Sequence, residues 1–217
     1  MGKDMRETAV LHRVKHGYTT GARSLASRSM GGLARTRVTP NALTTAGVSL
    51  CLAASVVVFF ENRNEWFFYW VGAALFVIGS ILDILDGALA RAGGKTTPFG
   101  AFLDSTTDRV GEGAMLGAIA LIFHRHDHAV ALALAFAAVA GSFLVSYTRA
   151  KAEGLGLRGD VGIGSRAERV VVITGGLVLA PISIWLLVGA IALLTATAWL
   201  TVVQRILYVR KQLVARE

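Results

Sequence analysis

The C-terminal third of the chain contains an apolar run that is too long for one membrane crossing. From Val170 to Val203, 34 residues pass without one Asp, Glu, Lys or Arg. An unbroken helix of that length would measure about 51 Å, whereas the hydrocarbon core of a bilayer is roughly 30 Å thick and needs about 20 apolar residues. Pro181 interrupts the run. The sequence therefore predicts two spans joined by a tight hairpin near Pro181.

The rest of the chain repeats this pattern. Of the 217 residues 54% are hydrophobic and only 17% are charged, against about a quarter in ordinary soluble domains. The mean hydropathy is +0.57. We therefore expect an all-α, polytopic membrane protein with six transmembrane helices, near residues 42–60, 67–90, 99–123, 129–150, 168–184 and 186–207.

The basic residues predict the orientation of these spans. With six spans and the N-terminus inside, all of the 22 Lys and Arg residues except Arg63 and Arg125 fall on the cytoplasmic side. We therefore expect a protein of the cell (inner) membrane with both termini in the cytoplasm. Residues 1–38 would form a basic juxtamembrane segment and residues 39–217 the six-span domain. A pI near 10.2 could suggest nucleic-acid binding, but the bases follow the membrane sides and form no continuous face, so we expect no nucleic-acid partner.

Four carboxylates interrupt the second and third predicted spans: Asp83, Asp86, Asp104 and Asp108. An ionised side chain at the bilayer centre costs at least roughly 2.5 kcal/mol, so four of them need a compensating charge. The spacing within each pair places its members on one helical stripe. Two facing stripes of Asp would make an all-oxygen site, which suits Mg²⁺ or Mn²⁺ better than Zn²⁺. The site would open toward the cytoplasm, and the sequence therefore predicts a cytoplasmic active site.

Two alternatives to a metal site stay open for these carboxylates. They could pair with nearby bases such as Arg91 and Arg109, although pairing alone does not account for Gly87 and Gly100 on the same stripes. Intramembrane acids also mark ion pathways, so a cation transporter is the alternative from a different functional class.

The same residues resemble a known signature. From Asp83 to Asp108 the chain reads D-x2-D-G-x2-A-R-x8-G-x3-D-x3-D, which is similar to the motif of the CDP-alcohol phosphotransferase family. The resemblance implies a six-span fold, usually a homodimer, with two metal ions. It also implies that Asp83, Asp86, Asp104 and Asp108 are metal ligands and that Asp108 is the general base. Contacts to the CDP-lipid would come from Asn41, Thr44, Gly87, Arg91 and Thr97. Asn41 and Thr44 have an alternative reading as a helix N-cap and a first-turn residue.

A second cluster concerns the acceptor. Arg149, Lys151, Arg166 and Arg169 flank one predicted cytoplasmic loop, and together they would suit a phosphate. The segment is similar to that of the bacterial phosphatidylinositol phosphate synthases. This resemblance implies transfer of a phosphatidyl group from CDP-diacylglycerol to inositol phosphate, giving phosphatidylinositol phosphate and CMP. Phosphatidylglycerophosphate synthase, acting on glycerol 3-phosphate, is the nearest alternative. A membrane prenyltransferase also uses aspartate-rich helices, but its motifs are expected in separate halves of a larger bundle.

Overall fold

The computed structural model describes residues 39–94, 96–163 and 165–216. Within these ranges the chain is all-helical and contains no strand. Its elements are α2 (Pro40–Phe59), the short 3-10 helix η1 (Glu61–Arg63), α3 (Glu65–Ala92), α4 (Pro98–Arg125), α5 (Ala129–Gly154), α6 (Arg166–Leu179) and α7 (Ile184–Val214). The predicted juxtamembrane segment 1–38 lies outside the described residues.

Each predicted span overlaps one helix, and the hairpin near Pro181 is confirmed between α6 and α7. The fifth span, predicted at 168–184, was drawn too long, because α6 ends at Leu179 where the hairpin begins. Four helices, α2, α3, α5 and α7, are long and apolar enough to cross a membrane. The other two differ for separate reasons. α4 carries three acidic residues, Asp104, Asp108 and Glu112, and α6 has only 14 residues, about 21 Å of helix.

Polar side chains mark where the helices begin. Thr39 caps α2, with its Oγ1 accepting a hydrogen bond from the Ala42 amide at 3.3 Å, and Pro40 follows it at the first helical position. The reading of Asn41 as this N-cap was therefore wrong, because Thr39 does the capping. Thr97 caps α4 in the same way, and Ser165 begins α6 through a capping box with Glu168.

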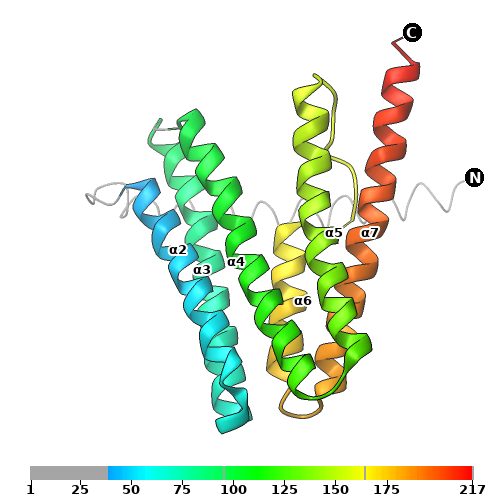
Figure 1. Cartoon of the computed structure of the whole chain (residues 1–217). Coiled ribbons are helices and arrows are strands. Elements are labelled where there is room, and N and C mark those ends of the chain that lie inside the picture. The colour runs from blue at the N-terminus through cyan, green and yellow to red at the C-terminus, as the bar shows by residue number, and fades with distance from the viewer. Residues whose placement is uncertain (1–38, 95, 164, 217) are drawn as a thin grey trace, which may run out of the picture.

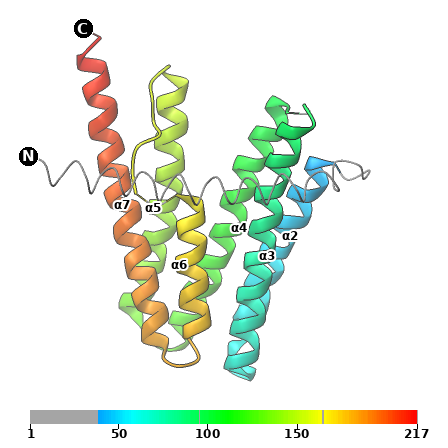
Figure 2. The ribbon, with the colours of Figure 1, turned by 180° about the vertical axis from the view of Figure 1, so that it is seen from behind.

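The six helices form a closed ring in the order α2, α3, α6, α7, α5 and α4, with each helix packed against its two neighbours. Figures 1 and 2 show α2, α3 and α4 on one side of the bundle and α5, α6 and α7 on the other. η1, the α4–α5 loop and the α6–α7 hairpin lie at one end. The loop before α4 and the C-terminus lie at the other end, from which the loop before α6 runs down to the middle of the bundle (Figure 1).

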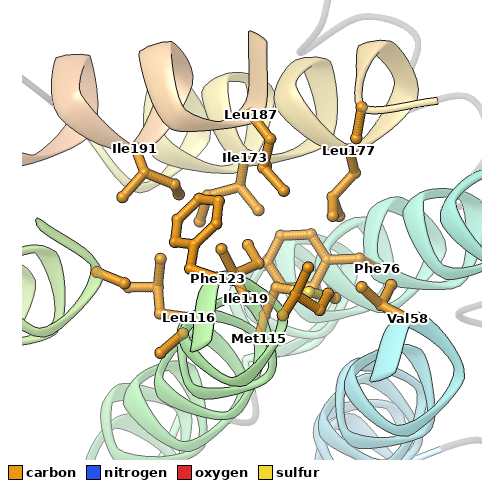
Figure 3. Packing of buried hydrophobic residues seen from close by; sticks show 14 of the residues in the cluster. Val58, Phe76, Met115, Leu116, Ile119, Phe123, Ile173, Leu177, Leu187 and Ile191 are labelled. Atoms are coloured by element: carbon orange, nitrogen blue, oxygen red, sulfur yellow. The ribbon is translucent and has the colours of Figure 1, made fainter. Parts of the chain in front are cut away.

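The main core joins the two sides. Figure 3 shows Phe76, Phe123, Ile173 and Leu187 meeting from α3, α4, α6 and α7, and these side chains are almost fully buried. In a bilayer, whose lipid tails are as apolar as these side chains, close packing would stabilise the bundle more than exclusion of water does.

Small residues bring α2 especially close to α3. A Cβ atom added at Gly79 would lie 2.7 Å from the carbonyl oxygen of Gly47 and 2.8 Å from the sulfur of Cys51. The same cysteine also approaches α4, because a Cβ at Gly111 would lie 3.0 Å from the Cβ of Cys51. α2 is therefore the element that fixes the spacing between α3 and α4.

Candidate active site

Three carboxylates converge at the end of the bundle that carries the loop before α4. Asp83 of α3 and Asp104 and Asp108 of α4 each offer an oxygen atom, and these atoms lie within 4.8 Å of one another. α3 and α4 are not neighbours in the helix ring, because α2 packs against both of them. The two predicted aspartate stripes therefore do not lie on helices packed directly against each other. α2 packs against both helices, and its glycine contacts set the distance between the two stripes.

The donor set suits a hard divalent cation. All three candidate ligand atoms are carboxylate oxygens, and the Asp83 side chain is only 4% exposed. The Oδ1 atom of Asp86 is buried and accepts no hydrogen bond from the described residues. A buried oxygen without a donor is costly, and a bound cation would satisfy it. The residues present therefore fit a metal ion.

Arg166, at the start of α6, supplies positive charge to this cluster. Its guanidinium pairs with Asp83 Oδ2 and lies 2.5 Å from Asp108 Oδ1. Arg109 is farther away, at 3.7 Å from Asp108 Oδ2. The expectation that bases pair with the aspartates thus holds for Arg109. The nearest base, however, is Arg166 of α6, which follows Asp108 by 58 positions in the sequence.

Beside the three carboxylates lies a cavity of about 140 Å³ between the first turns of α2 and α4 and the last turns of α3. The five residues predicted to contact the CDP-lipid all line it: Asn41, Thr44, Gly87, Arg91 and Thr97. Asp86 and Asp104 line it as well, so the cavity adjoins the carboxylate cluster.

The fourth aspartate occupies this cavity wall rather than the group of three. Asp86 is 2% exposed, and its Oδ2 accepts a hydrogen bond from Thr44 Oγ1. Thr44 is therefore more than a first-turn residue, because it ties α2 to the aspartate motif of α3.

The two glycines of the motif keep the cavity open. A Cβ at Gly87 would lie 3.3 Å from an Arg91 nitrogen. A Cβ at Gly100 would lie 3.0 Å from Thr97 Oγ1 and 3.9 Å from Asn41 Oδ1. A side chain at either position would fill space between residues that line the cavity.

The four bases predicted to bind the acceptor do not gather in one pocket. Arg166 alone reaches the aspartates. Arg149 is exposed and pairs with Glu153 at 2.8 Å. Lys151 lines a separate hollow between α5 and α7, and Arg169 is buried against Glu112 of α4.

The loop between α5 and α6 is held by α7. Gln212 accepts a hydrogen bond from the Arg158 amide at 3.0 Å and donates one to the Arg158 carbonyl at 2.8 Å. Arg205 donates to the carbonyls of Val161, at 3.0 Å, and Val145. Within the loop, a hydrogen bond from the Arg158 guanidinium lowers the pKa of Asp160 below its ordinary value. The chain entering α6, and with it Arg166, is thereby anchored.

Sequence reasoning missed three residues near the site: Glu112, Ser142 and Arg205. Glu112 carried a usable signal, because it follows Asp104 and Asp108 at the same four-residue spacing. Ser142 and Arg205 carried none, since a lone Ser or Arg in an apolar helix does not indicate its partner.

The chain is similar to known proteins in sequence and in fold. Residues 37–209 match the model of a family described as CDP-alcohol phosphatidyltransferase. A protein of Pyrococcus horikoshii named archaetidylinositol phosphate synthase is 35% identical over 185 residues, 83% of this chain and 88% of that protein.

Two solved structures of Mycobacterium tuberculosis phosphatidylinositol phosphate synthase are also similar. The structure with CDP-DAG bound has a TM-score of 0.73 and 30% identity, covering 86% of this chain and 94% of that one. The complex with manganese and citrate has a TM-score of 0.74 and 29% identity, covering 85% and 88%.

Proposed function

Because the chain belongs to the CDP-alcohol phosphatidyltransferase family, we propose that it transfers the phosphatidyl group of CDP-diacylglycerol to inositol phosphate, giving phosphatidylinositol phosphate and CMP. The observation that carries this proposal is the carboxylate cluster of Asp83, Asp104 and Asp108 beside a cavity lined by the same motif. A synthase similar to this chain is named for archaetidylinositol phosphate and another for phosphatidylinositol phosphate. Their names differ in the lipid but share the inositol phosphate, which supports this acceptor over glycerol 3-phosphate.

The metal site of the proposal consists of Asp83, Asp86, Asp104 and Asp108, holding two ions of Mg²⁺ or Mn²⁺. Manganese in a similar structure supports the choice of metal, as does the all-oxygen donor set. Bound there, such ions would offset the charge of the pyrophosphate and make its phosphorus more electrophilic.

The residues that line the cavity would hold the CDP group. Arg91 brings a positive charge to a pyrophosphate, Asn41 and Thr44 offer polar groups, and Thr97, the N-cap of α4, lines the cavity as well. Gly87 leaves room for the nucleotide. These residues bind and orient, so their contribution to rate would come from positioning the pyrophosphate.

Asp108 is the proposed general base. An inositol hydroxyl oxygen attacks the phosphorus that bears the diacylglycerol, the bond from that phosphorus to the bridging oxygen breaks, and CMP leaves with the electron pair. The proton of the hydroxyl passes to Asp108. Arg166 contacts Asp108 and would bind the acceptor phosphate beside it. Arg149 and Lys151, exposed on α5, would attract the anionic acceptor from solution, and Arg169 would support Arg166 from its buried place on α6.

We propose further that all six helices cross the cell (inner) membrane, with both termini and the active site on the cytoplasmic side. Arg63 and Arg125 lie at the end of the bundle opposite the carboxylate cluster, which agrees with the positive-inside rule. α4 and α6 would cross as part of the bundle, shielded by their apolar neighbours. The membrane lipids would surround the exposed apolar side chains, and by family resemblance the protein would form a homodimer.

The acceptor is tested with purified protein, CDP-diacylglycerol and Mg²⁺ or Mn²⁺, given one acceptor at a time. We expect CMP release with inositol phosphate and little with glycerol 3-phosphate or free inositol. Asp108→Asn is the matched control and should lower turnover by about 10²- to 10⁴-fold while the protein stays folded. CMP release with glycerol 3-phosphate alone would assign the chain to phosphatidylglycerophosphate synthesis. Cation flux across sealed vesicles without CMP release would favour a transporter.

A further inference from the structure

Two ion pairs connect α4 with α6, one within the proposed active site and one a helical turn beyond it. On α4, Asp104, Asp108 and Glu112 follow one another at four-residue intervals and share one face. On α6, Arg166 and Arg169 are three residues apart and share a face as well. Arg166 pairs with Asp108, and Arg169 pairs with Glu112. The two ion pairs lie one turn apart along α4, and only the pair of Arg166 with Asp108 belongs to the carboxylate cluster.

The ion pair between Arg169 and Glu112 is buried and has good hydrogen-bond geometry. Arg169 donates from Nε to Glu112 Oε1 at 2.7 Å and from a terminal nitrogen to Glu112 Oε2 at 2.9 Å, a two-point contact. Ser142 of α5 donates to Glu112 Oε1 at 2.8 Å. The side chains of Arg169 and Glu112 are 8% and 10% exposed. Glu112 thus accepts hydrogen bonds on both oxygens, from two other helices.

This pairing determines where the Arg169 charge lies. α4 and α6 are not neighbours in the helix ring, so side chains set how they face each other at this level. Asp108 is one turn from Glu112 on the same face, roughly 6 Å away between Cβ atoms. A buried guanidinium that lost Glu112 would turn to the nearest carboxylate, because an uncompensated buried charge is strongly unfavourable. Asp108 is such a carboxylate.

We propose that Glu112 is a positioning residue, which holds Arg169 away from the metal-binding aspartates so that Arg166 alone on α6 faces them. Loss of the Glu112 charge would let Arg169 compete with the divalent cation for Asp108. The inference rests on the metal site of the proposed function and adds to it a residue outside the family motif.

The test measures Mn²⁺ binding to purified protein, by electron paramagnetic resonance of the free ion. Glu112→Gln should weaken Mn²⁺ binding by about 10- to 100-fold, the range typical of residues that orient metal ligands. Removing the displaced base as well, in Glu112→Gln/Arg169→Gln, should bring the affinity back to within a few-fold of the wild type. Glu153→Gln makes the same chemical change in an exposed Glu paired with Arg149, and it should leave Mn²⁺ binding unchanged.

A second readout separates positioning from a general loss of structure. In Glu112→Gln the Mn²⁺ concentration that half-saturates CMP release should rise together with the dissociation constant measured for Mn²⁺. The double variant should reverse both changes. If Glu112→Gln does not fold, the exchanged pair Glu112→Arg/Arg169→Glu retains opposite charges. This exchanged variant should also bind Mn²⁺ more weakly than the wild type does, because the Arg at position 112 then lies on α4 one turn from Asp108.

Several outcomes would overturn the inference. Wild-type Mn²⁺ affinity in Glu112→Gln or in the exchanged pair would do so. Failure of the double variant to recover binding would show that Glu112 does not act through Arg169. Asp108→Asn in the same assay tests the metal site itself: if it binds Mn²⁺ as the wild type does, the proposed function fails, whereas weak binding there with normal binding in Glu112→Gln removes only the role of Glu112.

Discussion

A carboxylate inside a membrane helix needs a nearby positive charge, and Arg166 supplies it here. Its guanidinium contacts Asp83 and Asp108 together, and its side chain is 28% exposed. The same carboxylates are the proposed ligands of divalent cations. Arg166 and a bound ion would therefore both stabilise the ionised aspartates. This overlap predicts that Arg166 matters most for stability when no metal is bound.

Arg166→Gln should lower the free energy of unfolding by roughly 1–3 kcal/mol without metal, because the buried Asp83 loses a charged donor. Added Mn²⁺ should remove most of that deficit, since the ion replaces the missing charge. Thermal unfolding in detergent, with a chelator or with Mn²⁺, measures both values. Arg158→Gln, on the exposed loop, is the control and should change neither. An equal deficit under both conditions would contradict the overlap.

At the scale of elements, α2 organises the site although it carries no metal-site carboxylate. Its Thr44 binds Asp86, and Gly47 lets the backbone of α3 approach one turn before Asp83. Cys51 fills the space toward Gly111 of α4. The carboxylates of α3 and α4 thus meet at a distance set by the small residues of the intervening helix.

Gly79→Ala should therefore disturb both packing and the site. The added Cβ would lie within 2.8 Å of a backbone oxygen and a buried sulfur, so the helices must move apart, at a cost of about 1–3 kcal/mol. We expect a lower unfolding temperature and weaker Mn²⁺ binding. Gly175→Ala, on α6 with nothing within 4 Å of the new atom, should leave Mn²⁺ binding unchanged and should not lower the unfolding temperature, because Ala favours a helix more than Gly does. Equal effects of the two substitutions would show that the contact between Gly47 and Gly79 does not set the site.

The sequence predicted where the helices lie along the chain better than it predicted which helices pack against one another. The six helices, the hairpin at Pro181 and the convergence of Asp83 with Asp104 and Asp108 follow from apolar run lengths, one proline and a four-residue spacing. The place of α2 between α3 and α4 did not follow, because periodicity within one helix does not say which helix lies beside it. For the same reason the pairing of Arg169 with Glu112 was missed and Arg169 was grouped with the exposed bases Arg149 and Lys151.

On the scale of the whole molecule, the proposed active site lies at one end of the helix ring and an ion pair between η1 and α4 lies at the other. At the end opposite the site, the buried Glu61 of η1 pairs with Arg125 of α4 at 2.6 Å. The three helices α2, α3 and α4 carry the proposed metal and CDP-lipid site, and α5 and α6 carry the four bases proposed for the acceptor. A lipid-linked donor and a water-soluble acceptor would therefore approach Asp108 from different halves of the bundle.

The orientation of the bundle can be read from cysteine labelling in intact cells. Asn62→Cys, in η1, and Leu155→Cys, in the loop before α6, are both at exposed positions. The native Cys51 is buried and should not react. A membrane-impermeant maleimide should label Asn62→Cys in intact cells and Leu155→Cys only after the cells are opened. Labelling of both from the same side would contradict the six-span topology.

The central claim is that aspartates of α3 and α4 together hold divalent cations beside the cavity for the CDP group. Its most direct measurement is an anomalous difference map from crystals of the protein containing Mn²⁺. We expect density between Asp83, Asp104 and Asp108 and next to Asp86, with the Arg166 side chain moved off Asp83. Ordered Mn²⁺ only elsewhere on the protein, with Arg166 still paired to both aspartates at saturating Mn²⁺, would contradict the account.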